Sequence, residues 1–247
     1  MEIIFLGTNG WFDSKTGNTV CALLKTNTCN IILDAGFGFA KADQYLDPKK
    51  PTSIFLSHLH LDHIVGLHAL AKFKFPKGLN IYAPKSAISA LRTFIAQPFT
   101  VPIKDLSFKI KIQAAPKKMR FAGVQVTSLK LVHSSDCIGY RFQCFGKTIA
   151  YCTDTGKCKN FLTLADKADL LISECALRKG QDDGGWPHLD PEQAALLAKQ
   201  AQVKRLVLTH FDADNHPEKK HRSIAQKQAR KIFPNSIAAV DGLVISA

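Results

Sequence analysis

The sequence predicts an α/β fold in which two β-sheets pack against each other and helices cover their outer faces. Strand-like apolar runs occur in both halves of the chain, and helical patterns follow them. Because 46% of the 247 residues are hydrophobic, the chain can bury a sizeable core. Residues 1–247 are predicted to form one domain, since no linker rich in proline, glycine or serine interrupts the hydrophobic pattern.

The front of the chain reads as a series of short strands. Several of them end in turn signals, such as DAGFG at residues 34–38 and CFGK at residues 144–147. The predicted strands of this part are residues 2–6, 19–25, 30–33, 53–56, 109–114, 124–131, 138–144 and 148–152.

Helical patterns and further strands alternate in the later part. The clearest helix start is at Asp190, a plausible N-cap, since Pro191 suits the first turn and Glu192 suits the positive end of the helix dipole. The predicted helices are residues 63–72, 85–96, 191–201 and 218–233, and the late strands are residues 168–174, 204–210 and 236–246.

The sequence also bears on the compartment. It contains no apolar stretch near the ~20 residues that cross a membrane, and its start, MEIIFLGTNG, resembles a strand and a turn more than a signal peptide. We therefore expect a cytoplasmic protein without a membrane segment. Seven scattered cysteines form no C-x-x-C pair, so we expect reduced thiols without a catalytic role.

The formal net charge of +13 is unevenly distributed. Between Lys72 and Arg120 there are eleven Lys and Arg residues and one acid, and between Lys219 and Lys231 there are six and no acid. Such an excess attracts polyanions or anionic substrates. A solvated basic face is the alternative interpretation, and the charge alone does not identify RNA as a partner.

The segment FLSHLHLDHIVGL places His58, His60, Asp62 and His63 between an apolar strand and an apolar helical pattern. Burying these groups without compensation would cost free energy. Where the chain leaves the strand extended, His58 and His60 point to the same side, and Asp62 and His63 then open the helix. Since imidazole and carboxylate groups bind zinc-like ions, the cluster predicts a metal site with ligands for two ions.

Four residues cannot complete two metal sites, so further ligands are expected at the ends of later strands. His133 follows VTSLKLV, Asp154 follows GKTIAYC, and His210 follows VKRLVLT. The carboxyl ends of strands are where sites of α/β proteins are built. Each residue alone would suit a cap or a turn, but with the cluster they make a set of seven ligands.

These motifs resemble the metallo-β-lactamase superfamily. SHLHLDH, His133, YCTDTG with Asp154 and LVLTHF with His210 carry the resemblance, which runs from FLGTNG through ILDAGFG to LTHFDAD and is strongest to the ribonuclease Z-like branch. It implies an αβ/βα four-layer sandwich with a dinuclear site on one edge. It also implies one metal ion held by His58, His60 and His133, a second held by Asp62, His63 and His210, and Asp154 bridging the two.

The resemblance implies hydrolysis by a water that two divalent metal ions activate. Zinc is the favoured metal and manganese the alternative, because the ligand types do not separate them. Asp62 would orient or deprotonate the water. His188, in WPHLDPEQAA, matches a histidine that family members place near the scissile phosphate, and would protonate the leaving group. Glu174, in SECA, matches a glutamate of the ribonuclease Z pattern and would steady Asp62 or His188.

We therefore predict a metal-dependent phosphodiesterase that acts on small cyclic or linear phosphodiesters or on RNA ends. Relatives that mature tRNA carry a long arm after the third-motif histidine. Here only residues 134–153 separate His133 from Asp154, enough for one hairpin, which favours the smaller substrates. A tRNA 3′-processing endoribonuclease (ribonuclease Z) and a lactone or ester hydrolase with the same site are the alternatives.

Two further hypotheses concern partners. A non-enzymatic nucleic-acid or anion-binding protein would also use the basic surface, but it has no need of seven converging ligands. Homodimer formation is a separate hypothesis.

Overall fold

The computed structural model describes residues 1–246 and contains two large mixed sheets. Ala247, the last residue of the predicted domain, lies outside the described residues. The first sheet has the strand order β16 (Val244–Ser246), β1 (Glu2–Gly7), β3 (Cys21–Lys25), β4 (Asn30–Leu33), β5 (Thr52–Phe55), β6 (Leu79–Ala83) and β7 (Ile110–Ala114). The second has the order β15 (Ser236–Ala238), β13 (Leu206–Thr209), β12 (Leu170–Glu174), β11 (Lys147–Cys152), β10 (Ile138–Cys144), β9 (Val124–Lys130) and β8 (Lys118–Phe121).

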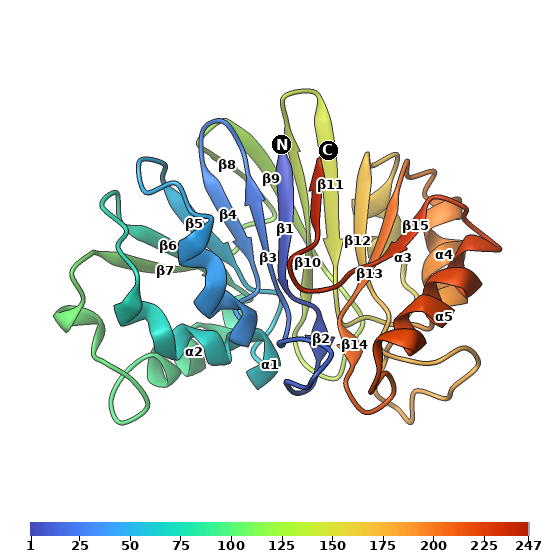
Figure 1. The fold of residues 1–247 in the computed structure, drawn as a ribbon. Helices are drawn as coiled ribbons and strands as arrows, with labels where there is room; N and C mark the ends of the chain where they lie inside the picture. The colour runs from blue at the N-terminus through green and yellow to red at the C-terminus, as the bar shows by residue number, and fades with distance from the viewer. Residues whose placement is uncertain (247) are drawn as a thin grey trace.

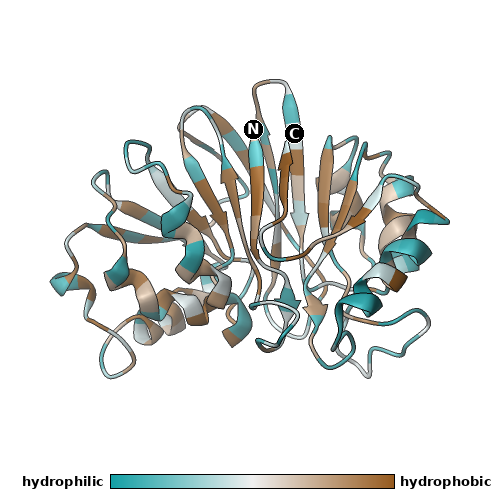
Figure 2. Cartoon of the chain, in the orientation of Figure 1, coloured by the Kyte–Doolittle hydropathy of each residue, from teal (hydrophilic) through white to brown (hydrophobic). Residues whose placement is uncertain are grey.

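The two sheets pack face to face around an apolar core to which both contribute. Phe55 of the first sheet meets Tyr140 and Phe142 of the second edge-on, with ring centroids 5.3 and 5.2 Å apart. Strands of both sheets are largely hydrophobic, whereas hydrophilic residues gather on the outer helices (Figure 2). Burial of these facing apolar surfaces is the main favourable contribution to folding.

Helices cover the outer face of each sheet (Figure 1). The first sheet is covered by the 3₁₀ helices η1 (Phe37–Gln44) and η2 (Val65–Lys72) and by α2 (Ile88–Phe94). The second is covered by α3 (Lys159–Ala165), α4 (Pro191–Gln200) and α5 (Lys219–Arg230). The predicted αβ/βα four-layer sandwich is therefore confirmed. The remaining short elements are α1 (Leu61–Ile64), η3 (Lys85–Ala87), η4 (Ile103–Asp105) and a small sheet of β2 (Asn9–Gly10) and β14 (Phe211–Asp212).

Parallel pairing places the functional loops at one edge. In the second sheet β11, β12 and β13 are parallel neighbours, and in the first sheet β4, β5 and β6 are parallel neighbours. These strands are largely buried on both faces, as parallel strands under helices usually are, and apolar residues predominate in most of them. Their carboxyl ends meet near α1, β2 and β14, at the lower edge of Figure 1.

Most predicted elements are found, with instructive differences. The predicted helix over residues 63–72 is wrong in kind, because α1 ends at Ile64 and the segment continues as 3₁₀ helix η2. Gly66 explains this: its amide donates to Ala35 O at 2.8 Å, and a Cβ there would lie 2.2 Å from Gly36 O. The segment therefore follows a backbone contact with a distant loop rather than its own helical period.

The predicted last strand is also corrected. Residues 236–246 form two strands, β15 and β16, that belong to different sheets, and the turn between them contains Gly242 at φ +87°. The sequence reasoning did not predict β6, β8, η1 or α3. By contrast, the region between His133 and Asp154 forms the antiparallel hairpin β10–β11, as expected.

Two remaining expectations concern membranes and thiols. Across residues 1–246, no helix combines the length and the apolar character that crossing a membrane requires. All seven cysteines are free, and all but Cys158 are buried.

Candidate metal centre

The seven predicted ligand side chains meet at the shared edge of the two sheets. Loops after four different strands, together with the short helix α1, bring them there. They are His58 and His60 after β5, Asp62 and His63 in α1, His133 after β9, Asp154 after β11, and His210 after β13. Their roles as metal ligands stay a prediction, which the convergence of their ligand atoms supports.

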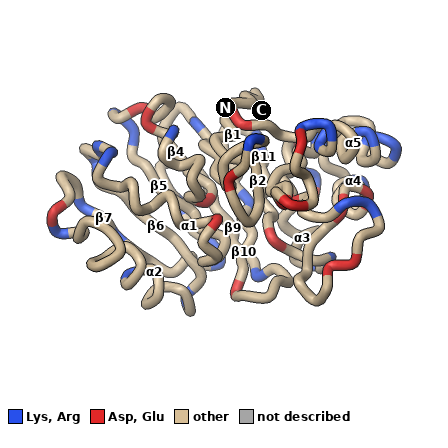
Figure 3. Tube along the Cα trace, turned by 60° about the horizontal axis from the view of Figure 1, so that its bottom comes forward, with Lys and Arg blue, Asp and Glu red and all other residues tan. Residues whose placement is uncertain are grey.

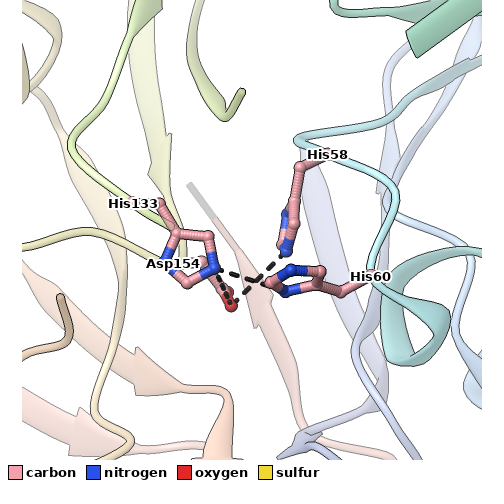
Figure 4. Close-up of side chains that lie close together, drawn as sticks. All are labelled: His58, His60, His133 and Asp154. Carbon is pink, nitrogen blue, oxygen red and sulfur yellow. Dashed lines mark hydrogen bonds and ion pairs between the residues drawn. The ribbon is translucent and has the colours of Figure 1, made fainter. Parts of the chain in front are cut away.

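The first group contains three histidines and a carboxylate. Ligand atoms of His58, His60, His133 and Asp154 all lie within 4.8 Å of one another. His58 and His60 reach in from one side and His133 and Asp154 from the other (Figure 4). Nε2 of His58 is buried without a hydrogen-bond partner and lies 3.7 Å from Asp154 Oδ2. A buried nitrogen lone pair in this state suits a metal ion as its partner.

The second group contains Asp62, His63 and His210, whose ligand atoms also lie within 4.8 Å of one another. Nε2 of His63 lies 3.1 Å from Nε2 of His210, and Asp62 Oδ2 lies 3.1 Å from His210 Nε2. The ring nitrogens thus point at a common volume.

Asp154 faces both groups at once. Its Oδ1 lies 3.2 Å from Nε2 of His63 and 3.2 Å from Nε2 of His210. Its Oδ2 lies 3.7 Å from Nε2 of His58 and 3.7 Å from Nε2 of His133. One carboxylate oxygen therefore serves each group, which is the arrangement that a bridging ligand between two ions needs.

The electrostatics of the two groups also fit cations. Burial, aided by the neighbouring His63, lowers the pKa of His58, and burial lowers the pKa of His60 and of His133. These three rings are therefore neutral at pH 7, the form that binds metals.

In the second group the carboxylates favour the positively charged form of the histidine rings. Burial acts to lower the pKa of His63 and of His210, but the carboxylates of Asp154 and Asp62 outweigh it and raise both. No Lys or Arg pairs with Asp62 or Asp154 within the described residues. The two carboxylates therefore favour positive charge at the ring nitrogens of His63 and His210, and divalent cations bound there would supply it.

Asp34 organises the second layer, and the sequence reasoning missed it. Its carboxylate is fully buried and accepts hydrogen bonds from Ser57 N at 2.6 Å, Tyr151 OH at 2.6 Å and His63 Nδ1 at 2.9 Å. The last bond leaves Nε2 of His63 free to face the site, as in the carboxylate–histidine–metal arrangement. The sequence does contain a signal for this role, because Asp34 directly follows an apolar strand, as His210 does, although in DAGFG it also suits a turn.

Replacing Tyr151 with phenylalanine is expected to weaken metal binding, by less than the roughly 10- to 100-fold that loss of a direct partner of a ligating histidine costs, because Tyr151 reaches His63 only through Asp34. The substitution removes one donor to Asp34 and lowers the free energy of unfolding by about 1.5–3 kcal/mol. Tyr140→Phe is the matched control, because it removes a buried hydroxyl that donates to a backbone carbonyl, Leu56 O, at 2.7 Å. Metal titrations and denaturant unfolding of both variants are the measurements. Equal metal affinity in the two variants would contradict the role given to Asp34.

Three site residues adopt the left-handed conformation at the ends of their strands. Asp34, Asp154 and His210 have φ values of 53°, 51° and 53°. Residues other than glycine rarely adopt this region, and where they do, it is often at functional sites. The reversal ends each strand and turns the side chain toward the shared edge.

The wall behind His210 depends on a glycine and a buried arginine. A Cβ on Gly10 would lie 2.6 Å from Cε1 of His210, so this position has room only for glycine. Arg222 of α5 is 1% exposed and donates to Thr8 Oγ1 at 2.6 Å and to the side-chain oxygen of Asn9. It thereby fixes the strand that carries Gly10.

His188 and Glu174 lie together beside the cluster. Glu174 is fully buried and its carboxylate accepts from His188 Nδ1 at 2.9 Å, from Thr155 N at 2.6 Å and from Leu189 N at 3.2 Å. A ring nitrogen of His188 lies within 4.8 Å of ligand atoms of Asp154 and His210. Of the two predicted partners of Glu174, the structure brings it against His188. Burial acts to lower the pKa of His188, but Glu174 outweighs it and raises the pKa to about 9.

Comparisons with known proteins identify the family that this chain matches. A family model described as a beta-lactamase superfamily domain matches residues 29–211. A ribonuclease Z of Bacillus licheniformis is 27% identical over 306 aligned positions, covering 98% of this chain and 97% of that protein. Because that alignment is longer than this chain, the relative has segments without a counterpart here.

Two solved structures share the fold. The metallo-beta-lactamase fold protein YhfI from Bacillus subtilis superposes with a TM-score of 0.85 at 24% identity, covering 100% of this chain and 99% of that one. The short form of human tRNase Z superposes with a TM-score of 0.77 at 23% identity, again covering 100% of this chain and 99% of that one.

Proposed function

Since this chain belongs to the β-lactamase superfamily, whose domain model matches residues 29–211, we propose that its histidine–aspartate cluster holds two metal ions and hydrolyses a phosphodiester. The chain is a metal-dependent hydrolase of that superfamily. The main support for this proposal is that one carboxylate oxygen of Asp154 faces each of the two ligand groups. Zinc is the proposed metal and manganese the alternative, since both accept imidazole and carboxylate ligands.

The metal ions would be held by His58, His60 and His133 on one side and by Asp62, His63 and His210 on the other, with Asp154 shared. When bound, two divalent cations activate a water and stabilise charge on the phosphoryl oxygens. The carboxylate of Asp62 lines the pocket in front of the cluster. In the proposed reaction it orients the attacking water and holds the proton that the water gives up.

His188 is the proposed proton donor to the leaving group. Its Nδ1 donates to Glu174, which leaves Nε2 for the substrate. His188 also lines the pocket. As water attacks phosphorus and the phosphorus–oxygen bond breaks, the proton on Nε2 passes to the departing oxygen. Glu174 supports the protonated ring by its charge, while cations bound nearby would act in the opposite direction.

Processing of tRNA 3′ ends is the second candidate function. The full-length similarity to a protein named ribonuclease Z favours it. The chain between His133 and Asp154 forms only the hairpin β10–β11, which offers no protruding arm for tRNA, so the smaller phosphodiesters remain the first choice. The single-domain and homodimer hypotheses stay predictions. The core that both sheets share supports the first of them.

Elemental analysis of protein purified without chelator is expected to find about two divalent metal ions per chain, as two-metal hydrolysis requires. Chelation should abolish hydrolysis of a chromogenic phosphodiester, and added zinc or manganese should restore it. One ion per chain would correct the site to a mononuclear one, and none, even after metal addition, would refute it. A lactone and a precursor tRNA assayed in parallel separate the alternative activities.

A further inference from the structure

A pocket of about 720 Å³ lies directly in front of the metal centre, a size typical of small-molecule sites. Its floor is formed by residues of the cluster and by His188. Around this floor the pocket is lined by an apolar set, Trp11, Leu61, Ala176, Leu177 and Trp186, and by a polar set, Gln181, Asp182, Asp183, Asp212 and Asn215.

The two tryptophans of this pocket are the only tryptophans of the chain, and both are strongly exposed. Trp11 is 65% exposed and Trp186 56% exposed. The Trp186 ring lies 5.8 Å from the His60 ring, beside the first ligand group. Trp11 lies beside the second group, where its backbone N–H donates to Asp62 Oδ2 at 2.8 Å. Large rings left in solvent at both ends of a metal site offer flat apolar surfaces to a ligand.

The charge around the pocket is acidic although the chain is basic overall. None of the lining residues is Lys or Arg, and the charged residues beyond the cluster are Asp182, Asp183 and Asp212. Arg178 and Lys179 precede the acidic pair on the same loop without lining the pocket, and they are engaged by Asn215 O and by the Glu192 carboxylate. Other Lys and Arg residues lie along α5, whereas acidic positions lie beside α1 and β2 at the middle of this face (Figure 3). A nucleic-acid strand needs cations along its path. Outside the ligand cluster and His188, the lining offers further phosphates no Lys or Arg side chain and three carboxylates.

We infer that the substrate is a small phosphodiester with one negative charge and one planar aromatic ring, such as a single nucleoside unit. Trp186 stacks on that ring, Trp11 forms the facing wall, and Asp182 and Asp183 reject more highly charged ligands. The inference rests on the proposed phosphodiesterase function and adds the class of substrate. Trp186 follows Gly184 and Gly185, which have φ values of 60° and 85°, and its own ring is more than half exposed, which leaves surface on which another ring can stack.

The test compares two probes that contain the same phosphodiester, adenosine 2′,3′-cyclic phosphate and methyl riboside 2′,3′-cyclic phosphate. The wild type should show a lower KM for the adenosine probe by roughly 5- to 100-fold, the range expected for one stacked base. Trp186→Ala should reduce the ratio of the two KM values to within about twofold of one, and Trp186→Phe should keep most of it. Phe99→Ala is the matched control, because Phe99 is 61% exposed but does not line the pocket.

Tryptophan fluorescence gives a readout that does not need turnover. The adenosine probe should quench the emission of the wild type and of Trp11→Phe, which keeps Trp186, while the methyl riboside probe should not. Equal KM ratios in the wild type and in Trp186→Ala, or no quenching by the adenosine probe, would overturn the inference. Quenching without hydrolysis of either probe would instead refute the proposed function and leave the binding class standing.

The proposed role of Asp182 and Asp183 is tested with a 5′-phosphorylated form of the adenosine probe. It should bind the wild type more weakly than the unphosphorylated form, and Asp182→Asn/Asp183→Asn should narrow that difference. Asparagine retains the oxygen that accepts from Gly184 N and Gly185 N, so the loop keeps its hydrogen bonds. Tighter binding of the 5′-phosphorylated probe to the wild type would contradict the role given to Asp182 and Asp183. It would favour RNA ends as the substrate.

Discussion

Replacing Asp62 with alanine is expected to remove nearly all hydrolysis, because its carboxylate is the proposed metal ligand and proton acceptor and also accepts from Trp11 N–H. Loss of the proton transfer alone would lower kcat by roughly 10²–10⁴-fold, and a weakened second metal site adds to that. The measurements are kcat with a phosphodiester and the metal content of the purified variant.

Asp62→Asn is the informative control. Asparagine keeps the shape and an oxygen that can accept from Trp11 N–H, but it cannot take a proton from water. We expect it to stay nearly as inactive as Asp62→Ala while it retains more metal. An Asp62→Ala variant within tenfold of the wild-type kcat at full metal content would show that another group activates the water.

Replacing His188 with alanine should lower kcat by roughly 10²–10⁴-fold on a phosphodiester with an alkoxide leaving group. Metal content should not change, because the seven proposed ligands remain. With a nitrophenol leaving group the loss should be much smaller, since that group departs without a proton. This dependence on the leaving group separates proton donation from a structural role.

His68→Ala serves as the control for removing a histidine outside the proposed ligand set. Its ring is exposed and its Nδ1 donates to Val65 O at 2.7 Å, so we expect activity close to that of the wild type. If His188→Ala lost the same factor with both leaving groups, His188 would act in positioning and another donor would have to be sought.

Local sequence patterns predicted much of the fold. The strands over residues 30–33 and 138–144 occur with the predicted bounds, because apolar runs between turn residues favour one local structure. The helix after Asp190 begins as predicted, and its cap is a complete capping box with Gln193. Such features depend on neighbouring residues alone.

Other features depend on contacts between distant segments. β6 was missed although it lies beside β5 in the first sheet, and η2 is 3₁₀ because Gly66 packs on the backbone of Ala35 and Gly36. Local sequence patterns do not include contacts with segments that are distant in the chain, so they do not predict such elements.

The candidate ligands can be identified without coordinates, since ligand-type side chains occur in one short motif and after three later strands. How they combine could not be predicted in this way. The Asp154 oxygens divide between two groups, Asp34 binds His63 while Tyr151 binds Asp34, and Trp11 and Trp186 line one pocket. These arrangements arise from sheet pairing and left-handed strand ends, which join segments far apart in the chain.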